Sequence, residues 1–233
     1  MAVPIAEALA GLNADRGASP AGKMIFVGLN YQDHQAETPL AAPTEPAIFA
    51  KLPNAVIGDR DPIVIPAGRE SRVDYEGELA VIVGRRASGL TVENALEHVY
   101  GYTILNDVTD RGIQFDHEQL ILGKGIDTFC PLGPVVALAE EIPDPGDLQL
   151  TTRVNGEVRQ QASTALLIFS VPELLAFITR FVSLELGDIV STGTPAGCGA
   201  FADPPTYLQP GDEVSVAIEG IGELRNPVVA AAA

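Results

Sequence analysis

Two glutamates one residue apart are the feature of this chain that points most directly to chemistry. Glu76 and Glu78 lie in VDYEGELAVIVG (Val73–Gly84), a segment that otherwise has the apolar character of a buried β-strand. Side chains at i and i+2 of a strand project from the same face, so the two carboxylates are expected side by side. Burial and repulsion disfavour ionising both, and a hard divalent cation removes that conflict. The segment therefore predicts a divalent-metal site; the alternative is an amphipathic strand whose polar face is wet.

Asp107 offers a third carboxylate. It follows the apolar run YGYTILN, where a strand is expected to end. An Asx turn closing that strand is the alternative interpretation. Beside two glutamates, Asp107 would complete a three-carboxylate face that leaves positions open for water and substrate, as Mg²⁺ typically requires. Such a site keeps about one net negative charge, so nearby basic groups would help an anionic substrate to bind.

A histidine and a glutamate three residues apart are a candidate base. His34 and Glu37 lie in GLNYQDHQAE, and this spacing places them on one face of a helical turn. A carboxylate that contacts the imidazole would orient it and raise its basicity, as a general base acting on water requires. The alternative is a solvated loop histidine. His98 and His117 are assigned structural roles, and because histidines and cysteines are not clustered in the sequence, no zinc site is expected.

Four further polar residues follow the predicted metal ligands. Arg111, Gln114 and Lys124 come soon after Asp107, and Lys124 is flanked by glycines that would let a ligand approach closely. A cation there could hold a carboxylate or an enolate oxygen. Thr194 lies in the glycine-rich run STGTPAGCG, which could offer a hydroxyl and backbone N–H groups to an anion. The alternative for each residue is an ordinary polar surface position.

Composition excludes several classes of partner. The chain has 233 residues with a net charge of −17, from 31 acidic and 14 basic residues. Nucleic acids and anionic membranes need basic patches, so neither is expected as a partner. No apolar run reaches the length of a membrane span, and no signal peptide is recognised. Cys130 and Cys198 have no metal-ligand spacing and are predicted to be reduced thiols in a cytoplasmic protein.

The elements that must position these residues are mostly strands. Helices are predicted from Val92 to Tyr100 and from Ser170 onward, where SVPE fits a capping box. Asn155-Gly156 predicts a hairpin turn. The fold class is α+β and β-rich, with residues 1–22 as a short N-terminal appendage (18–22 as a loop) and residues 23–229 as a single catalytic domain. Strands are predicted over Met24–Leu29, Ala47–Lys51, Ile63–Ile65, Val73–Val83, Tyr102–Asn106, Pro134–Leu138, Leu148–Val154, Asp188–Thr192 and Glu213–Glu219.

From about Lys23 to Val228 the chain resembles the fumarylacetoacetate hydrolase family. The segments that carry the resemblance occur in family order: GLNYQDHQAE, EPAIFAK, VDYEGELAVIVG, GYTILNDVTDRGIQ, GKGIDTFCPLGP, VNGEVRQ, LELGDIVSTGTPAGCG, and LQPGDEV followed by GIGELRN. One segment would mean little, but the ordered set is highly specific. It implies a mixed, rolled β-sheet with a few flanking helices, and usually a homodimer.

The resemblance also implies roles for the candidate residues. It assigns metal ligation to Glu76, Glu78 and Asp107, with Mg²⁺ or Mn²⁺ as cofactor, and the water-activating dyad to His34 and Glu37. Lys124, Gln114, Thr194 and Arg111 match positions around the substrate. Three positions depart from the family. Asp110-Arg111-Gly112 stands where Ala-Arg-Asp is frequent, Gly125-Ile126 where Ser-Phe is frequent, and Cys198 where Val is common.

These implications lead to one main function and several alternatives. The main hypothesis is a metal-dependent hydrolase that cleaves a C–C bond of an acylpyruvate-like 2,4-dioxo acid, with a small 2-oxo acid as its only partner besides a second copy of the chain. The alternatives are oxaloacetate decarboxylation and isomerisation of an unsaturated 2-hydroxy diacid in aromatic catabolism. A non-catalytic, metal-dependent binding protein is the alternative from another class.

Overall fold

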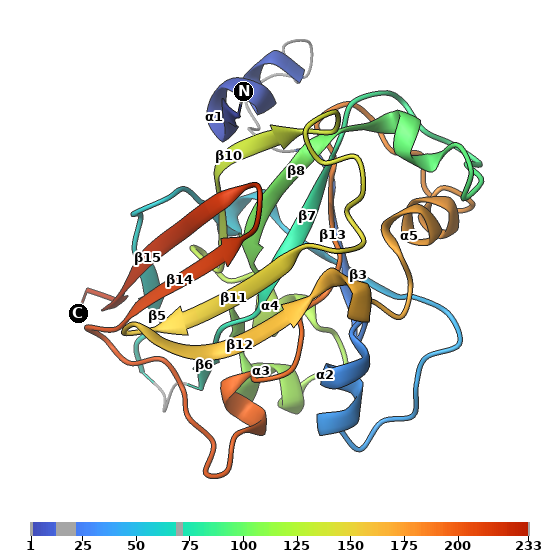
Figure 1. The fold of residues 1–233 in the computed structure, drawn as a ribbon. Helices are drawn as coiled ribbons and strands as arrows, with labels where there is room; N and C mark the ends of the chain where they lie inside the picture. The colour runs from blue at the N-terminus through green and yellow to red at the C-terminus, as the bar shows by residue number, and fades with distance from the viewer. Residues whose placement is uncertain (1, 13–21, 69–71, 233) are drawn as a thin grey trace.

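The fold is built from two mixed β-sheets that pack against each other (Figure 1). The computed structural model describes residues 2–12, 22–68 and 72–232. Within these residues, the larger sheet has the order β1-β10-β8-β7-β13-β2-β3, with β4 paired to β10. Its strands are β1 (Val3–Pro4), β2 (Met24–Gly28), β3 (Ala47–Lys51), β4 (Val56–Ile57), β7 (Gly77–Val83), β8 (Val99–Asn106), β10 (Cys130–Leu138) and β13 (Ile189–Ser191).

The second sheet has the order β12-β11-β14-β15-β5, and a short ladder joins β6 to β9. Both large sheets combine antiparallel with parallel pairs. The parallel pairs are β13 with β2 and β10 with β4 in the larger sheet, and β15 with β5 in the second. The predicted β-rich α+β class is thus confirmed. The strands of the second sheet are β5 (Ile63–Ile65), β11 (Gln149–Val154), β12 (Glu157–Ser163), β14 (Glu213–Ile218) and β15 (Gly222–Ala230). Those of the short ladder are β6 (Val73–Asp74) and β9 (Thr109–Asp110).

Short helices gather at the ends of the sheets. Figure 1 shows α2 and α3 at one end of the molecule, far from α1 at the other, with α4 nearer the middle. Helix α4 packs against α3, and the three helices carry His34, Arg111 and Lys124. None of the helices in the described part of the chain is long and apolar enough to cross a membrane. The α-helices are α1 (Ile5–Leu12), α2 (Gln32–Glu37), α3 (Arg111–Asp116), α4 (Ile121–Lys124) and α5 (Val171–Ile178), and the 3₁₀ turns are η1 (Pro53–Ala55), η2 (Ala95–His98), η3 (Thr164–Leu166) and η4 (Gly199–Phe201).

Strand β7 is the centre of the core. All seven of its residues are buried. Leu79, Val81 and Val83 pack into the cluster between the two sheets, whereas Ala80 and Ile82 pack into a second cluster on the opposite face. The strand is therefore covered on both sides, as its uninterrupted apolar sequence predicts. A carboxylate at its start, such as Glu78, is held inside the protein rather than on a wet face.

Two local predictions are confirmed in atomic detail. Helix α5 begins after Ser170, whose backbone N–H donates to the Glu173 carboxylate at 2.8 Å, completing the capping box. Strands β11 and β12 form the predicted hairpin. Asn155 (φ 53°) and Gly156 (φ 83°) both have positive φ, as a type I′ turn requires.

Two other predictions are wrong. The helix expected from Val92 to Tyr100 is only the 3₁₀ turn η2, because Val99 already pairs with Val83 as the start of β8. Sheet pairing therefore overrides the helical spacing of the apolar residues. The strand expected over 73–83 is interrupted between Asp74 and Gly77, where β6 pairs with β9 and β7 pairs with β8.

The N-terminal residues pack onto the larger sheet. Val3 pairs with Val136 of β10, and α1 buries Ala8 and Leu9 in the cluster that also contains Ile82. The division into an appendage (1–22) and a domain (23–229) stays a prediction, and most of the loop predicted over 18–22 lies outside the described residues.

Gly101 is the position where we expect a single methyl group to destabilise this sheet. A Cβ at residue 101 would lie 2.3 Å from the carbonyl oxygen of Ala137, a backbone atom of the neighbouring strand β10. We expect Gly101→Ala to lower the free energy of unfolding by about 1–3 kcal/mol or more, measured by urea denaturation. Gly11→Ala is the control, because nothing lies within 4 Å of its Cβ position in α1. Equal stability of the two variants would contradict this prediction.

Candidate active site

The structure brings the three predicted carboxylates together in the interior. Glu76 lies between β6 and β7, Glu78 lies in β7, and Asp107 directly follows β8. The Asp107 N–H donates to the Glu76 carbonyl at 2.8 Å, which joins the ends of the two strands. Glu76 is 6% exposed, Glu78 2% and Asp107 0%, and one oxygen from each lies within 4.8 Å of the others. The wet-face and Asx-turn alternatives are therefore wrong.

Buried lysines partly balance this charge. Lys124 Nζ lies 2.9 Å from Glu76 Oε2 and 2.6 Å from Asp107 Oδ2. Lys51, the last residue of β3, donates to Asp107 Oδ1 at 2.5 Å and to the carbonyl of Phe129 at 2.5 Å. Burial by itself would lower the pKa of Lys124, but the charges of Asp107 and Glu76 raise it above its ordinary value. Lys51 is a site residue that sequence reasoning did not select.

The two glutamates differ in how well they are compensated. Burial by itself would raise the pKa of Glu76, but the charges of Lys124 and Arg111 lower it to about 2. The pKa of Glu78 is raised well above its ordinary value by burial and by the charges of Asp107 and Glu76. The Glu78 carboxylate accepts hydrogen bonds from the Ser191 hydroxyl and, at 3.1 Å, from the Gly193 N–H. No lysine or arginine in the described residues forms an ion pair with Glu78.

These donors fit a divalent cation. Three carboxylates supply hard oxygen ligands, and the uncompensated Glu78 supplies a negative charge that the protein's own cations do not neutralise. A divalent ion would offset that repulsion directly, because a nearby positive charge favours the ionised carboxylate. The chemistry of the donor set thus supports a metal site at Glu76, Glu78 and Asp107.

His34 and Glu37 form the expected pair on α2. His34 Nδ1 lies 2.7 Å from Glu37 Oε1. The Gly197 N–H donates to both Glu37 oxygens, at 3.1 and 3.3 Å, and fixes the carboxylate from the other side. Gly197 has φ +100°, and a Cβ there would lie 2.1 Å from the Arg159 carbonyl, so only glycine fits. His34 is 8% exposed, which makes the interpretation as a solvated loop histidine wrong.

The dyad and the carboxylate cluster face the same region. The charge of His34 contributes to lowering the pKa of Glu76. The segment before α2 is anchored next to the loop that follows β13, because the Asn30 side chain donates to the carbonyl of Thr192 at 2.8 Å. This hydrogen bond therefore holds α2, which carries His34, close to the central strand β7, which carries Glu78.

Arg111 is buried in ion pairs rather than left free for a ligand. Its Nη2 lies 2.6 Å from Glu76 Oε1, and its Nε donates to Asp74 Oδ2 at 2.9 Å. Asp74 in turn accepts the Gly199 N–H at 2.8 Å, so the loop that carries residue 199 is tied to the arginine. Arg111 Nη1 also donates to Gln114 Oε1 at 3.0 Å and orients that side chain.

Thr194 and Gln160 fix the backbone between the two glutamates. The Thr194 hydroxyl donates to the Gly77 carbonyl at 3.0 Å and accepts from Gln160 Nε2 at 2.8 Å. Gln160 Oε1 accepts the Gly77 N–H at 2.9 Å. The peptide that links Glu76 to Glu78 is therefore held on both sides. The substrate-binding roles of Arg111, Gln114 and Thr194 stay predictions.

Sequence reasoning missed several residues of the site. Gln160 lies in the hairpin strand β12, and its contact with Gly77 spans 83 residues, so no local spacing indicates it. Tyr31, which precedes α2, is fully buried, and its hydroxyl has no hydrogen-bond partner in the described part of the chain. Burial and the charge of Glu78 raise the pKa of Tyr31, which keeps its proton in place. Its neighbours in the sequence, Asn30, Gln32 and Asp33, are polar, so no local signal indicates its burial.

Both cysteines are buried thiols, as predicted for reduced residues. Burial raises the pKa of Cys130 to about 12 and that of Cys198 well above its ordinary value. The fold nevertheless brings one histidine and one cysteine together that are far apart in the sequence. His34, Glu37 and Cys198 each offer a ligand atom, and these atoms lie within 4.8 Å of one another.

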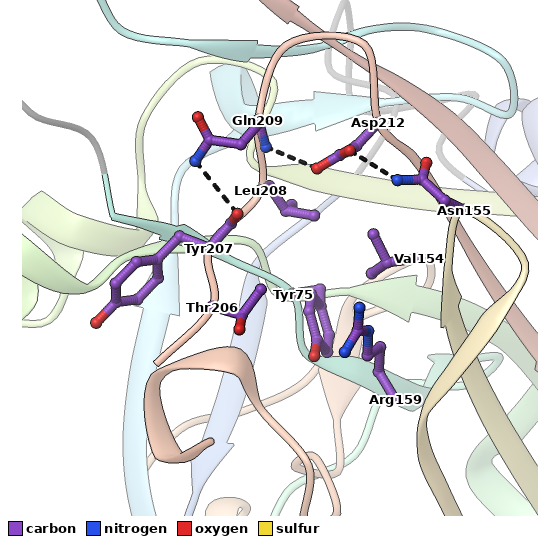
Figure 2. Close-up of a pocket in the computed structure, with 9 residues that line it drawn as sticks. All are labelled: Tyr75, Val154, Asn155, Arg159, Thr206, Tyr207, Leu208, Gln209 and Asp212. Carbon is purple, nitrogen blue, oxygen red and sulfur yellow. Dashed lines mark hydrogen bonds between the residues drawn. The ribbon is translucent and has the colours of Figure 1, made fainter. Parts of the chain in front are cut away.

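A surface pocket of about 210 Å³ borders this region (Figure 2). Tyr75 and Arg159 line it, and on the opposite side Asp212 accepts a hydrogen bond from Asn155 at 2.8 Å. Tyr75 connects the pocket to the site, because its hydroxyl donates to the Gly197 carbonyl at 3.0 Å. The three carboxylates do not line the pocket, so it is not the site of the chemistry.

Comparison with known proteins identifies the family. Residues 23–229 match the family described as "Fumarylacetoacetate (FAA) hydrolase C-terminal". The match covers most of the chain, and the protein belongs to the fumarylacetoacetate hydrolase family. This result confirms the resemblance seen in the ordered sequence segments.

Three relatives illustrate the range of the family. The chain is 43% identical over 211 residues to "Oxaloacetate tautomerase YisK" of Bacillus subtilis (strain 168), covering 90% of this chain and 70% of that protein. A solved fumarylacetoacetate hydrolase from Exiguobacterium antarcticum has 48% identity and a TM-score of 0.84, covering 90% of this chain and 75% of that one. A solved 5-carboxymethyl-2-hydroxymuconate delta-isomerase from Mycobacterium smegmatis has 41% identity and a TM-score of 0.81, covering 91% and 80%.

The curated relatives extend beyond this chain. The chain spans 70% of the first curated relative and 66% of the second and third. Several of these relatives carry the word mitochondrial in their names, so one cellular location does not follow from the family.

Proposed function

We propose that the protein is a divalent-metal-dependent enzyme that interconverts the keto and enol forms of oxaloacetate or a closely similar 2-oxo diacid. The observation that carries the proposal is a buried base, His34 paired with Glu37, beside the cluster of Glu76, Glu78 and Asp107. Enolisation needs a proton acceptor and a positively charged place for the developing enolate oxygen. The likeness to a protein named an oxaloacetate tautomerase supports the choice of substrate.

The cofactor follows from the donor set. Glu76, Glu78 and Asp107 would hold Mg²⁺ or Mn²⁺, which would supply Lewis-acid polarisation of the 2-oxo carbonyl. Around these ligands, three buried cations (Lys51, Lys124 and Arg111) face four carboxylates once Asp74 is included. A divalent ion changes that balance from one negative to one positive charge. The acidic chain would then present a locally positive site to a dianionic substrate.

Each remaining residue has a role that its contacts support. His34, oriented through Nδ1 by Glu37, takes a proton from C3 of the keto form, and protonation of the former carbonyl oxygen completes the enol. Lys124 brings its ammonium group beside the ligands and stabilises negative charge on the substrate. Gln114, which Arg111 orients through a 3.0 Å hydrogen bond, binds the substrate, and Thr194 holds the peptide between Glu76 and Glu78 through its hydrogen bond to the Gly77 carbonyl.

Hydrolysis of a C–C bond in an acylpyruvate is the second candidate, supported by the 48% identity to a solved fumarylacetoacetate hydrolase. The difference lies in what His34 deprotonates. In hydrolysis the base takes a proton from water, which then attacks the distal carbonyl, whereas tautomerisation moves one substrate proton and consumes no water. Decarboxylation of oxaloacetate and isomerisation of a 2-hydroxy diacid would use the same site, and the likeness to a delta-isomerase supports the latter.

The test is to assay the purified protein with Mg²⁺, with Mn²⁺ or with a chelator. Oxaloacetate tautomerisation is followed by the ultraviolet absorbance of the enol and by NMR of deuterium exchange at C3, and pyruvate release by a coupled assay. We expect metal-dependent acceleration of enol–keto exchange from oxaloacetate without stoichiometric pyruvate. Pyruvate release from an acylpyruvate, with no effect on exchange, would replace the proposal by hydrolysis. No effect on either substrate would favour isomerisation or a metal-dependent binding protein.

Assembly and location are separate proposals. We propose a homodimer, as the family resemblance implies, which light scattering on the purified protein checks by its mass. A cytoplasmic location and a role in aromatic catabolism likewise remain proposals.

A further inference from the structure

A second group of possible metal ligands lies next to the three carboxylates. One ligand atom each from His34, Glu37 and Cys198 lies within 4.8 Å of the others. Cys198 is fully buried and His34 is 8% exposed, so these side chains have few alternative conformations. At a tetrahedral zinc ion, nitrogen, oxygen and sulfur ligand atoms lie about 3.3–3.6 Å apart, so an inward movement of up to about 1.5 Å would bring this set into range.

The fold, rather than the local sequence, creates this group. His34 and Glu37 are on α2, near the start of the chain, whereas Cys198 directly precedes η4, near its end. The Gly197 N–H donates to the Glu37 carboxylate at 3.1 Å, which ties the cysteine's loop to the helix. The valine that the family commonly has at this position would offer no ligand atom. The cysteine therefore gives this chain a donor set that other members need not share.

The two neighbouring groups differ in the metal that they suit. Carboxylates alone favour hard ions such as Mg²⁺ and Mn²⁺. Imidazole, thiolate and carboxylate together are ligands typical of zinc, and a thiolate selects for softer ions. We propose that His34, Glu37 and Cys198 form an inhibitory site for a thiophilic divalent ion such as Zn²⁺, separate from the site of the catalytic ion. The thiol proton leaves for solvent as the sulfur–metal bond forms.

Inhibition follows from the ligands that the ion would use. A histidine whose nitrogen lone pair is bound to a metal cannot accept a proton from substrate, and a bound Glu37 no longer orients the ring. Zn²⁺ should therefore stop turnover even when Mg²⁺ saturates the carboxylate cluster. This consequence rests on the proposed function, but occupancy of the site by the metal does not.

The experiment uses Co²⁺ as a spectroscopic probe of the full chain in excess Mg²⁺. A cobalt ion bound by a thiolate gives an intense charge-transfer band in the near ultraviolet, whereas one bound by carboxylates alone does not. We expect this band in the unsubstituted protein and its loss on titration with Zn²⁺. It should be absent from Cys198→Val and Cys198→Ser and retained in Cys130→Ala, whose cysteine lies in a different buried cluster.

Each outcome decides the proposal. A missing band in the unsubstituted protein, or a band that persists in a folded Cys198 variant, overturns it and leaves Cys198 as a buried thiol. Two substitutions of different polarity are used so that the test does not depend on one variant folding. Circular dichroism shows which of the two variants is folded, and only a folded variant is compared. In the activity assay, Zn²⁺ should inhibit Cys198→Val about 100-fold more weakly than the unsubstituted protein, each relative to its own activity. A thiolate band in a protein without tautomerase activity would support the metal site and contradict only the proposed function.

Discussion

Glu78→Gln should eliminate metal-dependent activity while leaving the metal-free protein as stable as before, or more stable. Glu78 has no basic partner in the described residues, and its ionised form is disfavoured by burial and by Asp107 and Glu76. Glutamine can still accept the hydrogen bonds from Ser191 and Gly193, and it removes the repulsion. Metal affinity should fall because one of three anionic ligands is lost. We expect kcat/KM to fall about 10³-fold or more, since Lewis-acid stabilisation is worth several kcal/mol.

Thermal unfolding with and without Mg²⁺ measures this prediction. The unsubstituted protein should gain Tm with Mg²⁺ because the ion binds only the folded state, and Glu78→Gln should gain little or nothing. A variant that is clearly less stable than the unsubstituted protein without metal, or one that keeps the full rise with Mg²⁺, would show that Glu78 is a structural residue.

Asp107→Asn is the informative contrast. Asp107 accepts from both Lys51 and Lys124, so its neutralisation leaves two buried ammonium groups short of a partner. We expect the metal-free variant to lose about 3–5 kcal/mol of stability, because removal of one member of a buried ion pair leaves an uncompensated charge. Denaturant unfolding of the two variants at one pH makes the comparison. Equal effects of the two substitutions would contradict the difference in their partners.

Much of the fold could be predicted because its signals are local. The Asn155-Gly156 turn and the capping box after Ser170 each depend on residues within a few positions of one another. Strands β3 and β5 have the predicted bounds, since each is a short apolar run next to turn-forming residues. The helix expected over 92–100 failed for the opposite reason: Val99 pairs with Val83, and a contact of that separation has no local signal.

The site divides in the same way. Spacing alone indicated the pairs Glu76 with Glu78 and His34 with Glu37, because a strand and a helical turn each place such neighbours together. The cations escaped detection, since Lys51 ends a strand whose other residues are mostly exposed, and its partner Asp107 is 56 residues away. Arg111 lies beside Glu76 in the structure, but its ion pairs with Asp74 and Glu76 depend on burial that composition does not reveal.

His34→Ala should remove turnover and leave the metal site nearly intact. The imidazole contacts Glu37 and the edge of the Phe201 ring at 5.5 Å between centroids, and forms no hydrogen bond or ion pair with the three carboxylates. Loss of a general base typically costs about 10²–10⁴-fold in rate, so kcat should fall by that factor. Calorimetric titration with Mg²⁺ should give nearly the same affinity as in the unsubstituted protein.

Two further variants separate a catalytic role from a structural one. His117→Ala changes an exposed histidine just after α3 and should leave kcat unchanged. Glu37→Gln keeps a side chain that can still contact Nδ1 but removes the charge that raises the basicity of His34. It should therefore show an intermediate loss of kcat at unchanged metal affinity, because orientation is retained while basicity falls. Full activity in His34→Ala would remove the imidazole from the mechanism, and loss of metal binding in that variant would assign it to the metal site instead.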